Sequence, residues 1–429
     1  MTTKSVQLMY GRGTISVELP RDARAHIISK PAFPPLKPAQ EVYANAMASP
    51  VECESLESLC VGCTSACILI CDITRPVPNK VFLRPMIETM LAAGIAAADI
   101  TVLVATGLHR PNEGAELAEL VGDDWVLKTV SVVNHFALND DDHIDLGETA
   151  TRSTPVKLDK RFVNADLRIA TGLVEPHFMA GYSGGRKVIA PGVAHHETIR
   201  TFHSARFMED PAAVQCNLLH NPLHEEQLEI VRLLGNVYAF NTVIDEDRNL
   251  VFASFGEVIA SHLQAVDFVR QYTEIPVGRQ FNTIVTSSAG YPLDQTYYQT
   301  VKGMVTPLDI LAPGGTLIIA SECTEGIGSS HYRQAQERLV SMGPDAFLDT
   351  LMAKKLADVD EWQTEMQLKS MRSGKVYLYS TGLNDEDHAL TGVSRTQSIE
   401  EVIAKSMNEH NDPNVAFIPE GPYVVPMAS

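Results

Sequence analysis

Short apolar strand patterns alternate with helical patterns along most of this chain, and this alternation restricts the fold more than any other feature. A strand pattern at 67–72 is followed by helical spacing at 80–93 and by a buried strand pattern at 99–106. The alternation continues with a helix at 114–121, strands at 129–133 and 165–173, and helices at 223–234 and 257–272. Parallel strands need such helical connections and are covered by helices on both faces. The sequence therefore predicts an α/β fold.

The length and a break in the pattern predict two domains. A chain of 429 residues exceeds the roughly 250–300 residues at which a single core stops growing. The stretch 274–280 contains the Pro-Val-Gly typical of a linker. We expect an N-terminal domain at 1–275 and a C-terminal domain at 280–410, with 411–429 able to return to the first. Each should hold a largely parallel sheet flanked by helices, with the active site in the interdomain cleft.

The second half and the first residues give further patterns. Residues 6–10 and 14–19 flank Gly-Arg-Gly and predict an opening hairpin. In the C-terminal domain we expect strands at 283–287, 316–320, 376–380 and 415–419, and helices at 335–341, 346–356 and 399–408.

The charge balance excludes two classes of partner. With 34 basic and 53 acidic residues the net charge is −19, which repels nucleic acid and anionic membranes. An anionic substrate therefore needs a local basic pocket. The first 20 residues show no apolar targeting run, so we expect a cytoplasmic protein.

Five of the seven cysteines lie close together in the sequence. The spacing of three of them also suits zinc or an iron–sulfur cluster. We favour a structural role, because two of them lie in the apolar run 66–71, where cysteine behaves as a small buried hydrophobe. The five are Cys53, Cys60, Cys63, Cys67 and Cys71.

Two polar loops follow predicted strands. Asp72, Thr74 and Arg75 come after the first strand, where a hydroxyl and a guanidinium can bind a phosphate or carboxylate. His109 follows Thr-Gly-Leu after the next strand, on a loop where an imidazole can exchange protons near neutral pH. A capped helix with a surface arginine, and a solvated loop histidine, are the structural alternatives.

The segment 175–187 is the densest in functional residue types. Its glycines bring backbone amides close together and it ends in Arg186-Lys187, which predicts an anion-binding loop. It is not a Walker A loop, because Val188 stands where the Ser or Thr for magnesium belongs. A lysine beside a second cation should have a lowered pKa and some nucleophilic amine. His203, further on, suits nickel, zinc or copper.

A fourth polar segment, 288–303, follows the first strand of the C-terminal domain. If the part after Pro292 is helical, Gln299 and Lys302 share one face of that helix. They would then be able to reach one ligand. An exposed amide and an ordinary surface lysine are the alternative.

Together these four segments resemble the lactate racemase family, the LarA-type enzymes that use a nickel-pincer nucleotide. The resemblance covers residues 72–362. It implies that the cofactor, Ni(II)-pyridinium-3,5-bisthiocarboxylic acid mononucleotide, is covalently attached to Lys187 and that His203 binds its nickel. It also implies cofactor contacts that involve Asp72, Thr74, Arg75, Gln299 and Lys302.

The same resemblance assigns the catalytic and substrate-binding roles. His109 and His177 are implied as the paired acid and base. Substrate binding is implied for Arg75, Lys302, Tyr298 and Trp362. The implied reaction inverts C2 of a small, lactate-like 2-hydroxy acid by hydride removal and return. The implied partners are this substrate and the proteins that make the cofactor; the oligomeric state stays open.

Three rival functions remain at this point. A sugar-acid 2-epimerase or a malate-type racemase would use the same core with other pocket residues. A zinc-dependent hydrolase would use His177, His195, His196 and His203. A binding protein that closes on an organic anion without turnover is the third. Nickel content and an adduct on Lys187 would separate the racemase from the last two.

Overall fold

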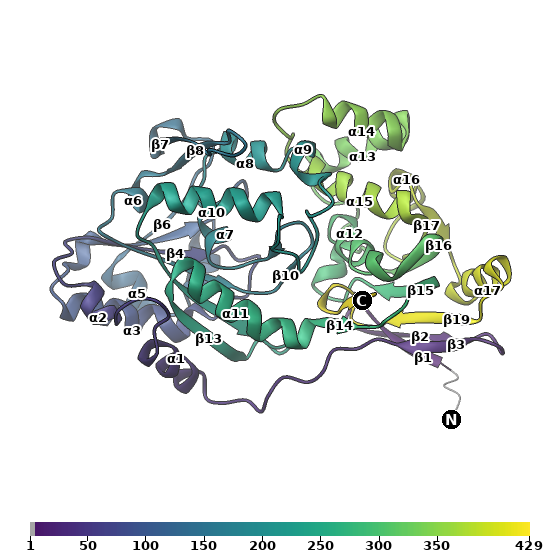
Figure 1. Cartoon of the computed structure of the whole chain (residues 1–429), viewed down its shortest axis with the longest axis horizontal. Helices are drawn as coiled ribbons and strands as arrows, with labels where there is room; N and C mark the ends of the chain where they lie inside the picture. Colours follow the sequence, from purple (N-terminus) through teal and green to yellow (C-terminus); the bar gives the residue numbers. More distant parts are fainter. Residues whose placement is uncertain (1–4) are drawn as a thin grey trace. The chain divides into compact units, whose positions relative to one another are not determined.

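The computed structural model describes residues 5–429 and divides the chain into two compact units. The N-terminal unit comprises Ala32–His203 and Asp210–Gln271. The C-terminal unit comprises the chain up to Pro31, Ser204–Glu209 and Tyr272–Ser429. Each is a mixed α/β structure with helices around a six-stranded sheet, in agreement with the predicted fold class (Figure 1).

The N-terminal unit is built on a sheet of order β13-β12-β9-β4-β5-β6. The strands are parallel except β13, which runs antiparallel to β12 at one edge. The sheet strands are β4 (Ala66–Cys71), β5 (Ile100–Ala105), β6 (Ser131–Asn134), β9 (Leu167–Leu173), β12 (Tyr238–Ile244) and β13 (Leu250–Glu257); two small pairs are β7 (His143–Glu148) with β8 (Pro155–Asp159) and β10 (Pro176–His177) with β11 (Gly181–Tyr182).

Helices of this unit bury alternate residues of the strands. One core joins Ile68 and Ile70 of β4 and Val102 of β5 to helices such as α3, because successive side chains of a strand point to opposite faces. The helices are α1 (Ala39–Ala48), α2 (Leu56–Leu59), α3 (Asn79–Ala92), α4 (Gly114–Val121), α5 (Asp124–Thr129), α6 (Lys160–Val163), α7 (Arg186–Ile189), α8 (His196–Phe202), α10 (Pro222–Leu234) and α11 (Val258–Thr273).

The C-terminal unit has a fully parallel sheet of order β18-β17-β16-β15-β19-β3. Its strands are β3 (Arg24–Ile27), β15 (Phe281–Ser287), β16 (Leu311–Ala320), β17 (Gly374–Tyr379), β18 (Ser394–Thr396) and β19 (Asn414–Ile418), with the predicted hairpin β1 (Ser5–Tyr10) and β2 (Gly13–Glu18) and the pair β14 (Glu274–Pro276) and β20 (Val425–Met427). Its helices are α9 (Ala205–Met208), α12 (Tyr297–Val305), α13 (Ser330–Met342), α14 (Pro344–Met352), α15 (Glu361–Ser373), α16 (Asp385–Leu390) and α17 (Ile399–His410).

The two chain ends group differently from the division expected at 275–280. The segment up to Pro31 belongs to the C-terminal unit, because β3 pairs with β19 and the hairpin β1–β2 packs on the same core. The last segment, 411–429, stays in that unit too, since β19 pairs with β15. Within residues 5–429, no helix combines the length and the apolar character needed to span a membrane.

Candidate functional site

Two polar loops of the N-terminal unit meet at one edge of its sheet. Strands β4 and β5 are parallel neighbours whose last residues, Cys71 and Ala105, are in register. Asp72 follows the first and the His109 loop follows the second, so both leave the same edge. His109 Nδ1 lies 2.6 Å from Asp72 Oδ2, and Thr74 Oγ1 donates to Asp72 Oδ1 at 2.6 Å.

This contact defines the state of both groups. Burial raises the pKa of Asp72, but the hydrogen bond and charge of His109 and the hydrogen bond from Thr74 outweigh it, so that the pKa is lowered. The carboxylate is therefore ionised and draws the Nδ1 proton of His109 toward itself. The second ring nitrogen, Nε2, then carries the lone pair, on a side chain that is 62% exposed. His109 is thus set up as a proton acceptor.

Arg75 is held by a carboxylate from a third strand end. Its Nη1 lies 2.6 Å from Oε1 of Glu175, which follows β9, the neighbour of β4 on the other side. An anionic ligand that binds Arg75 would share its guanidinium with Glu175. The sequence offered Glu175 only as the start of the glycine-rich segment, so this pairing was missed.

Two positions of the glycine-rich loop must be glycine, because their surroundings leave no room for a side chain. Gly184 has φ +83°, and a Cβ there would lie 2.5 Å from Val174 Cγ2. At Gly181 a Cβ would lie 2.4 Å from the carbonyl oxygen of Asn217. Only glycine meets both demands. The loop leads into α7, whose second residue is Lys187.

Arg186 does not add its charge to an anion-binding loop as expected. Its side chain is fully buried, and its Nε donates to Nδ1 of His224 at 2.6 Å, while Nη2 donates to the carbonyls of Ala180 and Tyr182, both at 3.1 Å. Nη1 lies 2.9 Å from Nε2 of His262. Burial lowers the pKa of Arg186 to about 9. The buried guanidinium thus holds the glycine-rich loop in place through these hydrogen bonds.

Lys187 lies near His203. Burial lowers the pKa of His203 to about 4, and the charge of Lys187 contributes to that shift. His203 is 8% exposed, and its Nδ1 lies 2.8 Å from the carbonyl oxygen of Ile199. A carbonyl accepts only, so Nδ1 carries the proton and Nε2 the lone pair, as in metal-binding histidines. Burial and the charge of Asp72 raise the pKa of Cys71 to about 11. The charges of Arg75 and Lys187 act in the opposite direction.

His177 lies at the start of the glycine-rich loop in the opposite tautomer. The backbone amides of Ala180 and Met179 donate to its Nδ1 at 3.2 and 3.5 Å. Nδ1 is therefore the acceptor and Nε2 carries the proton. The ring is 8% exposed and stacks on Phe178 with centroids 5.1 Å apart.

The C-terminal unit carries the other predicted residues. The helix expected after Pro292 is α12, which holds Tyr298, Gln299 and Lys302. Oε1 of Gln299 is buried and has no hydrogen-bond partner within the described part of the chain. Nε2 of Gln363 donates to the carbonyl of Tyr298 at 2.6 Å, which brings α15, and with it Trp362, alongside α12.

The four-histidine zinc set of the rival hydrolase is not assembled. Among residues 5–429, one group of three or more metal-ligand side chains comes within 4.8 Å, and it consists of Asp140, His195 and His196. Neither His177 nor His203 belongs to it. The clustered cysteines form no such group either, and burial raises the pKa of Cys60 to about 11, as expected for a structural thiol.

Comparison with known proteins identifies the family. The lactate racemase N-terminal domain model matches residues 10–215, and the lactate racemase C-terminal domain model matches residues 278–425. The chain belongs to the lactate racemase family. It is therefore an enzyme of the isomerase class.

Relatives of this lactate racemase family member match along nearly its whole length. A lactate racemase from Thermoanaerobacterium thermosaccharolyticum is 29% identical over 98% of this chain and 99% of the relative, and one from Lactiplantibacillus plantarum is 29% identical over 97% and 98%. The structure of the lactate racemase apoprotein from T. thermosaccharolyticum matches with a TM-score of 0.90 and 26% identity, over 98% of this chain and 99% of that one. A crystal structure of a Thermotoga maritima protein shares the fold, with a TM-score of 0.64, 16% identity, and coverage of 86% and 96%.

Proposed function

We propose that this enzyme interconverts the enantiomers of a small, lactate-like 2-hydroxy acid, with a nickel-pincer nucleotide attached to Lys187. The observation that carries the proposal is the pairing of His109 with Asp72 at the sheet edge from which Arg75 also projects. It provides a proton acceptor and a carboxylate-binding guanidinium on adjacent loops. The names of the relatives, lactate racemases, supply the substrate class.

The residues present fit the cofactor. Lys187 provides an amine on a loop whose glycines at 181 and 184 are kept bare by packing. His203 provides an imidazole whose Nδ1–H is anchored on a carbonyl, which directs Nε2 to a borderline-soft metal such as nickel. The buried, unpartnered Oε1 of Gln299 is a polar atom that a ligand would satisfy. Asp72, Thr74, Arg75 and Lys302 complete the proposed contact set.

The cofactor that Lys187 and His203 would hold would supply hydride-transfer chemistry at C2 of the substrate. This route suits a 2-hydroxy acid, because direct loss of the C2 proton would place a second negative charge beside the carboxylate. In our proposal His109 takes the hydroxyl proton through Nε2, and Asp72 stabilises the imidazolium that forms. Arg75 holds the carboxylate by charge-assisted hydrogen bonds.

Racemisation needs a second proton-exchanging group for the other enantiomer, and we assign it to His177. In the tautomer described above its Nε2–H would be the donor to the substrate oxygen, so His177 would donate where His109 would accept. Substrate contacts are also proposed for Lys302, as a cation for the carboxylate, and for Tyr298 and Trp362.

Mass spectrometry with metal analysis tests the cofactor assignment. The full chain is purified from a host that makes the cofactor, with Lys187→Ala, His203→Ala and, as control, His220→Ala, whose side chain is 82% exposed. We expect an adduct mapped to Lys187 and stoichiometric nickel in the wild type and the control. Nickel should fall in His203→Ala. Unmodified Lys187 in material that racemises lactate would overturn the assignment.

The histidine roles are tested separately on the loaded enzyme. We expect His109→Ala and His177→Ala each to abolish exchange between D- and L-lactate while the adduct stays in place. Assays with malate and with sugar acids on the same samples define the substrate. Full activity in either variant would remove that histidine from the mechanism.

A further inference from the structure

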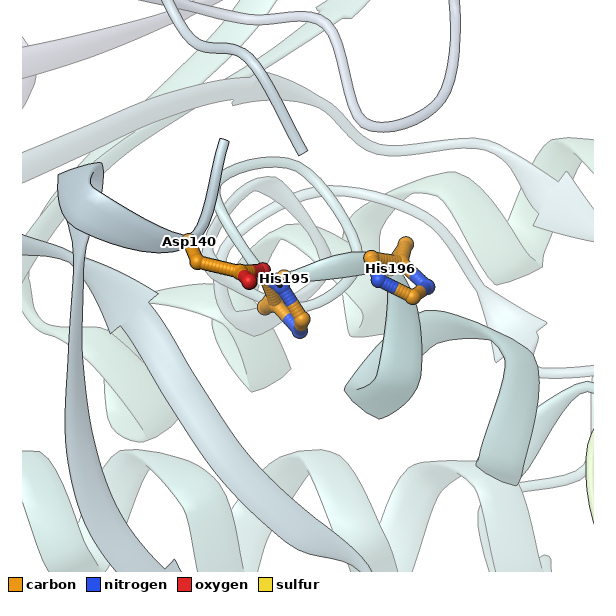
Figure 2. Close-up of side chains that lie close together, drawn as sticks. All are labelled: Asp140, His195 and His196. Atoms are coloured by element: carbon orange, nitrogen blue, oxygen red, sulfur yellow. Dashed lines mark hydrogen bonds and ion pairs between the residues drawn. The ribbon is translucent and has the colours of Figure 1, made fainter. Parts of the chain in front are cut away.

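The cluster of metal-ligand side chains in the N-terminal unit has no part in the proposed reaction. One ligand atom each from Asp140, His195 and His196 lies within 4.8 Å of the others. Figure 2 shows the carboxylate of Asp140 directed at the His195 ring, with His196 next to it where α8 begins. Asp140 comes from the short turn Asp140–Asp142 before β7, so the cluster joins segments 55 residues apart.

The orientation of His195 suits a metal ligand. The backbone amide of Glu197 donates to its Nδ1 at 3.3 Å, so Nε2 carries the proton and faces Asp140 Oδ1 at 2.8 Å. A divalent cation can replace that proton. In a tetrahedral site with bonds of about 2.0–2.1 Å, ligand atoms lie roughly 3.3 Å apart, so a bound ion would require this pair to open by about 0.5 Å.

His196 supplies a ring nitrogen that can bind a metal ion. Its Nδ1 is buried and has no hydrogen-bond partner among residues 5–429. Its ring lies beside that of His195, with centroids 4.2 Å apart. Buried polar nitrogens are nearly always paired, so an unpaired one beside a His–Asp contact points to a missing ligand.

A second layer of side chains holds the cluster in place. The His143 ring meets that of His195 edge to face with centroids 4.9 Å apart, and its Nδ1 lies 2.8 Å from the carbonyl of Asn139. His143 Nε2 is in turn 3.0 Å from Nε2 of His135. Such outer contacts orient the ligands of metal sites.

We propose that Asp140, His195 and His196 bind a divalent first-row transition-metal ion such as Zn²⁺ or Ni²⁺. Two imidazoles and a carboxylate form a donor set that these borderline-soft ions prefer. The side chain of Asp140 is 87% exposed and that of His195 3%, so the ion enters from solvent and water completes its coordination. The ion clamps the Asp140 turn to the start of α8, the helix that ends beside His203, seven residues and about 10 Å further on.

Cobalt and zinc binding to the cofactor-free full chain test this site. The background is His203→Ala, so that the proposed nickel ligand is removed. We expect one Co²⁺ per chain with visible d–d absorption and no thiolate charge-transfer band, and a Tm that rises with Zn²⁺ or Ni²⁺ and falls again with chelator. Asp140→Asn and His196→Ala should each weaken binding at least tenfold.

Two controls keep the test specific. Asp141→Asn changes the neighbouring carboxylate, and His220→Ala removes an exposed histidine; both should retain the affinity and the Tm shift. Circular dichroism and the metal-free Tm verify that the variants fold. Equal metal uptake by Asp140→Asn and the wild type, a thiolate band that points to the cysteines instead, or no binding at millimolar Zn²⁺ would overturn the proposal.

Discussion

His109 Nδ1 lies 2.6 Å from Asp72 Oδ2, and this single contact decides which nitrogen of the imidazole can accept a proton. The carboxylate is buried and ionised, the imidazole is exposed, and the two come from neighbouring parallel strands. In the proposed function Asp72 therefore positions His109 and sets its tautomer.

Replacing Asp72 by Asn should uncouple this pair. The amide can donate to Nδ1, which would place the ring proton on Nε2 and block the accepting position. We expect kcat for lactate racemisation to fall about 10²–10³-fold, in the range that general base catalysis contributes, with little change in KM.

The matched control for Asp72→Asn is Asp99→Asn, an exposed carboxylate before β5 in the same unit. It should leave kcat and the pH profile unchanged. Wild-type kcat in Asp72→Asn, with the cofactor loaded, would show that the contact does not set the tautomer in catalysis.

The glycine-rich loop gives a prediction with a closely matched comparison. Gly184 and Gly235 have φ angles of +83° and +84°, but a Cβ at Gly184 would lie 2.5 Å from Val174 Cγ2, whereas one at Gly235 would meet nothing within 4 Å. Both Ala variants should lose about 1–3 kcal/mol, because residues with a side chain rarely adopt a φ near +80°. Gly184→Ala should lose a further 1–3 kcal/mol or so from overpacking.

Urea unfolding of the two glycine variants measures this difference. The added methyl group should also distort the glycine-rich loop. Gly184→Ala should therefore carry less of the proposed adduct on Lys187 than Gly235→Ala does. Equal stability of the two variants would mean that the loop relaxes around an added methyl group.

The buried guanidinium of Arg186 should be irreplaceable by lysine. A single ammonium cannot reach His224 and the two carbonyls at once, and each buried acceptor left unpaired costs about 1–3 kcal/mol. We expect Arg186→Lys to lower the free energy of unfolding by about 3 kcal/mol or more. Arg84→Lys, at a side chain 47% exposed, is the control and should change it little.

A stable Arg186→Lys protein would contradict the structural role given to this side chain. In that case the charge at 186 would be available to a ligand after all, and anion affinity of the loop would be the next measurement.

The sequence predicted the ends of the strands well, because short apolar runs mark where a buried strand begins and ends. Asp72 and the loop of His109 follow two of these strand ends. It could not predict the inward turn of Arg186, since that depends on His224 and His262, which are 38 and 76 residues away. The pairing of Asp140 with His195 was likewise invisible, because no motif links the two.

Tertiary pairing also explains the difference at the chain ends. The four-residue strand β3 carries no strong pattern of its own, and its burial is only partial. It joins the C-terminal sheet because β19 offers a parallel edge. Such pairings connect distant segments, so local periodicity does not reveal them.

Two buried histidines should make the protein less stable as the pH falls from 7 to 4. Burial, followed by the charge of Arg186, lowers the pKa of His224 to about 3 and moves that of His262 well below its usual value. Below pH 6.5 these two histidines become protonated in the unfolded chain, whereas in the folded chain they stay neutral to a lower pH. Stability is therefore present above the unfolded pKa and declines as the pH falls through this window, by up to about 1.4 kcal/mol per pH unit for each histidine.

Urea unfolding at several pH values between 7 and 4 measures this slope in the wild type, His224→Asn and His220→Asn. The asparagine at 224 keeps an acceptor for Arg186 but cannot titrate, so the slope should become shallower by the share of one histidine. The exposed His220, at 82%, is the control, and its variant should keep the wild-type slope. An unchanged slope in His224→Asn would mean that the His224 ring is protonated in the folded protein. Arg186 would then be held by a group other than the lone pair of His224 Nδ1.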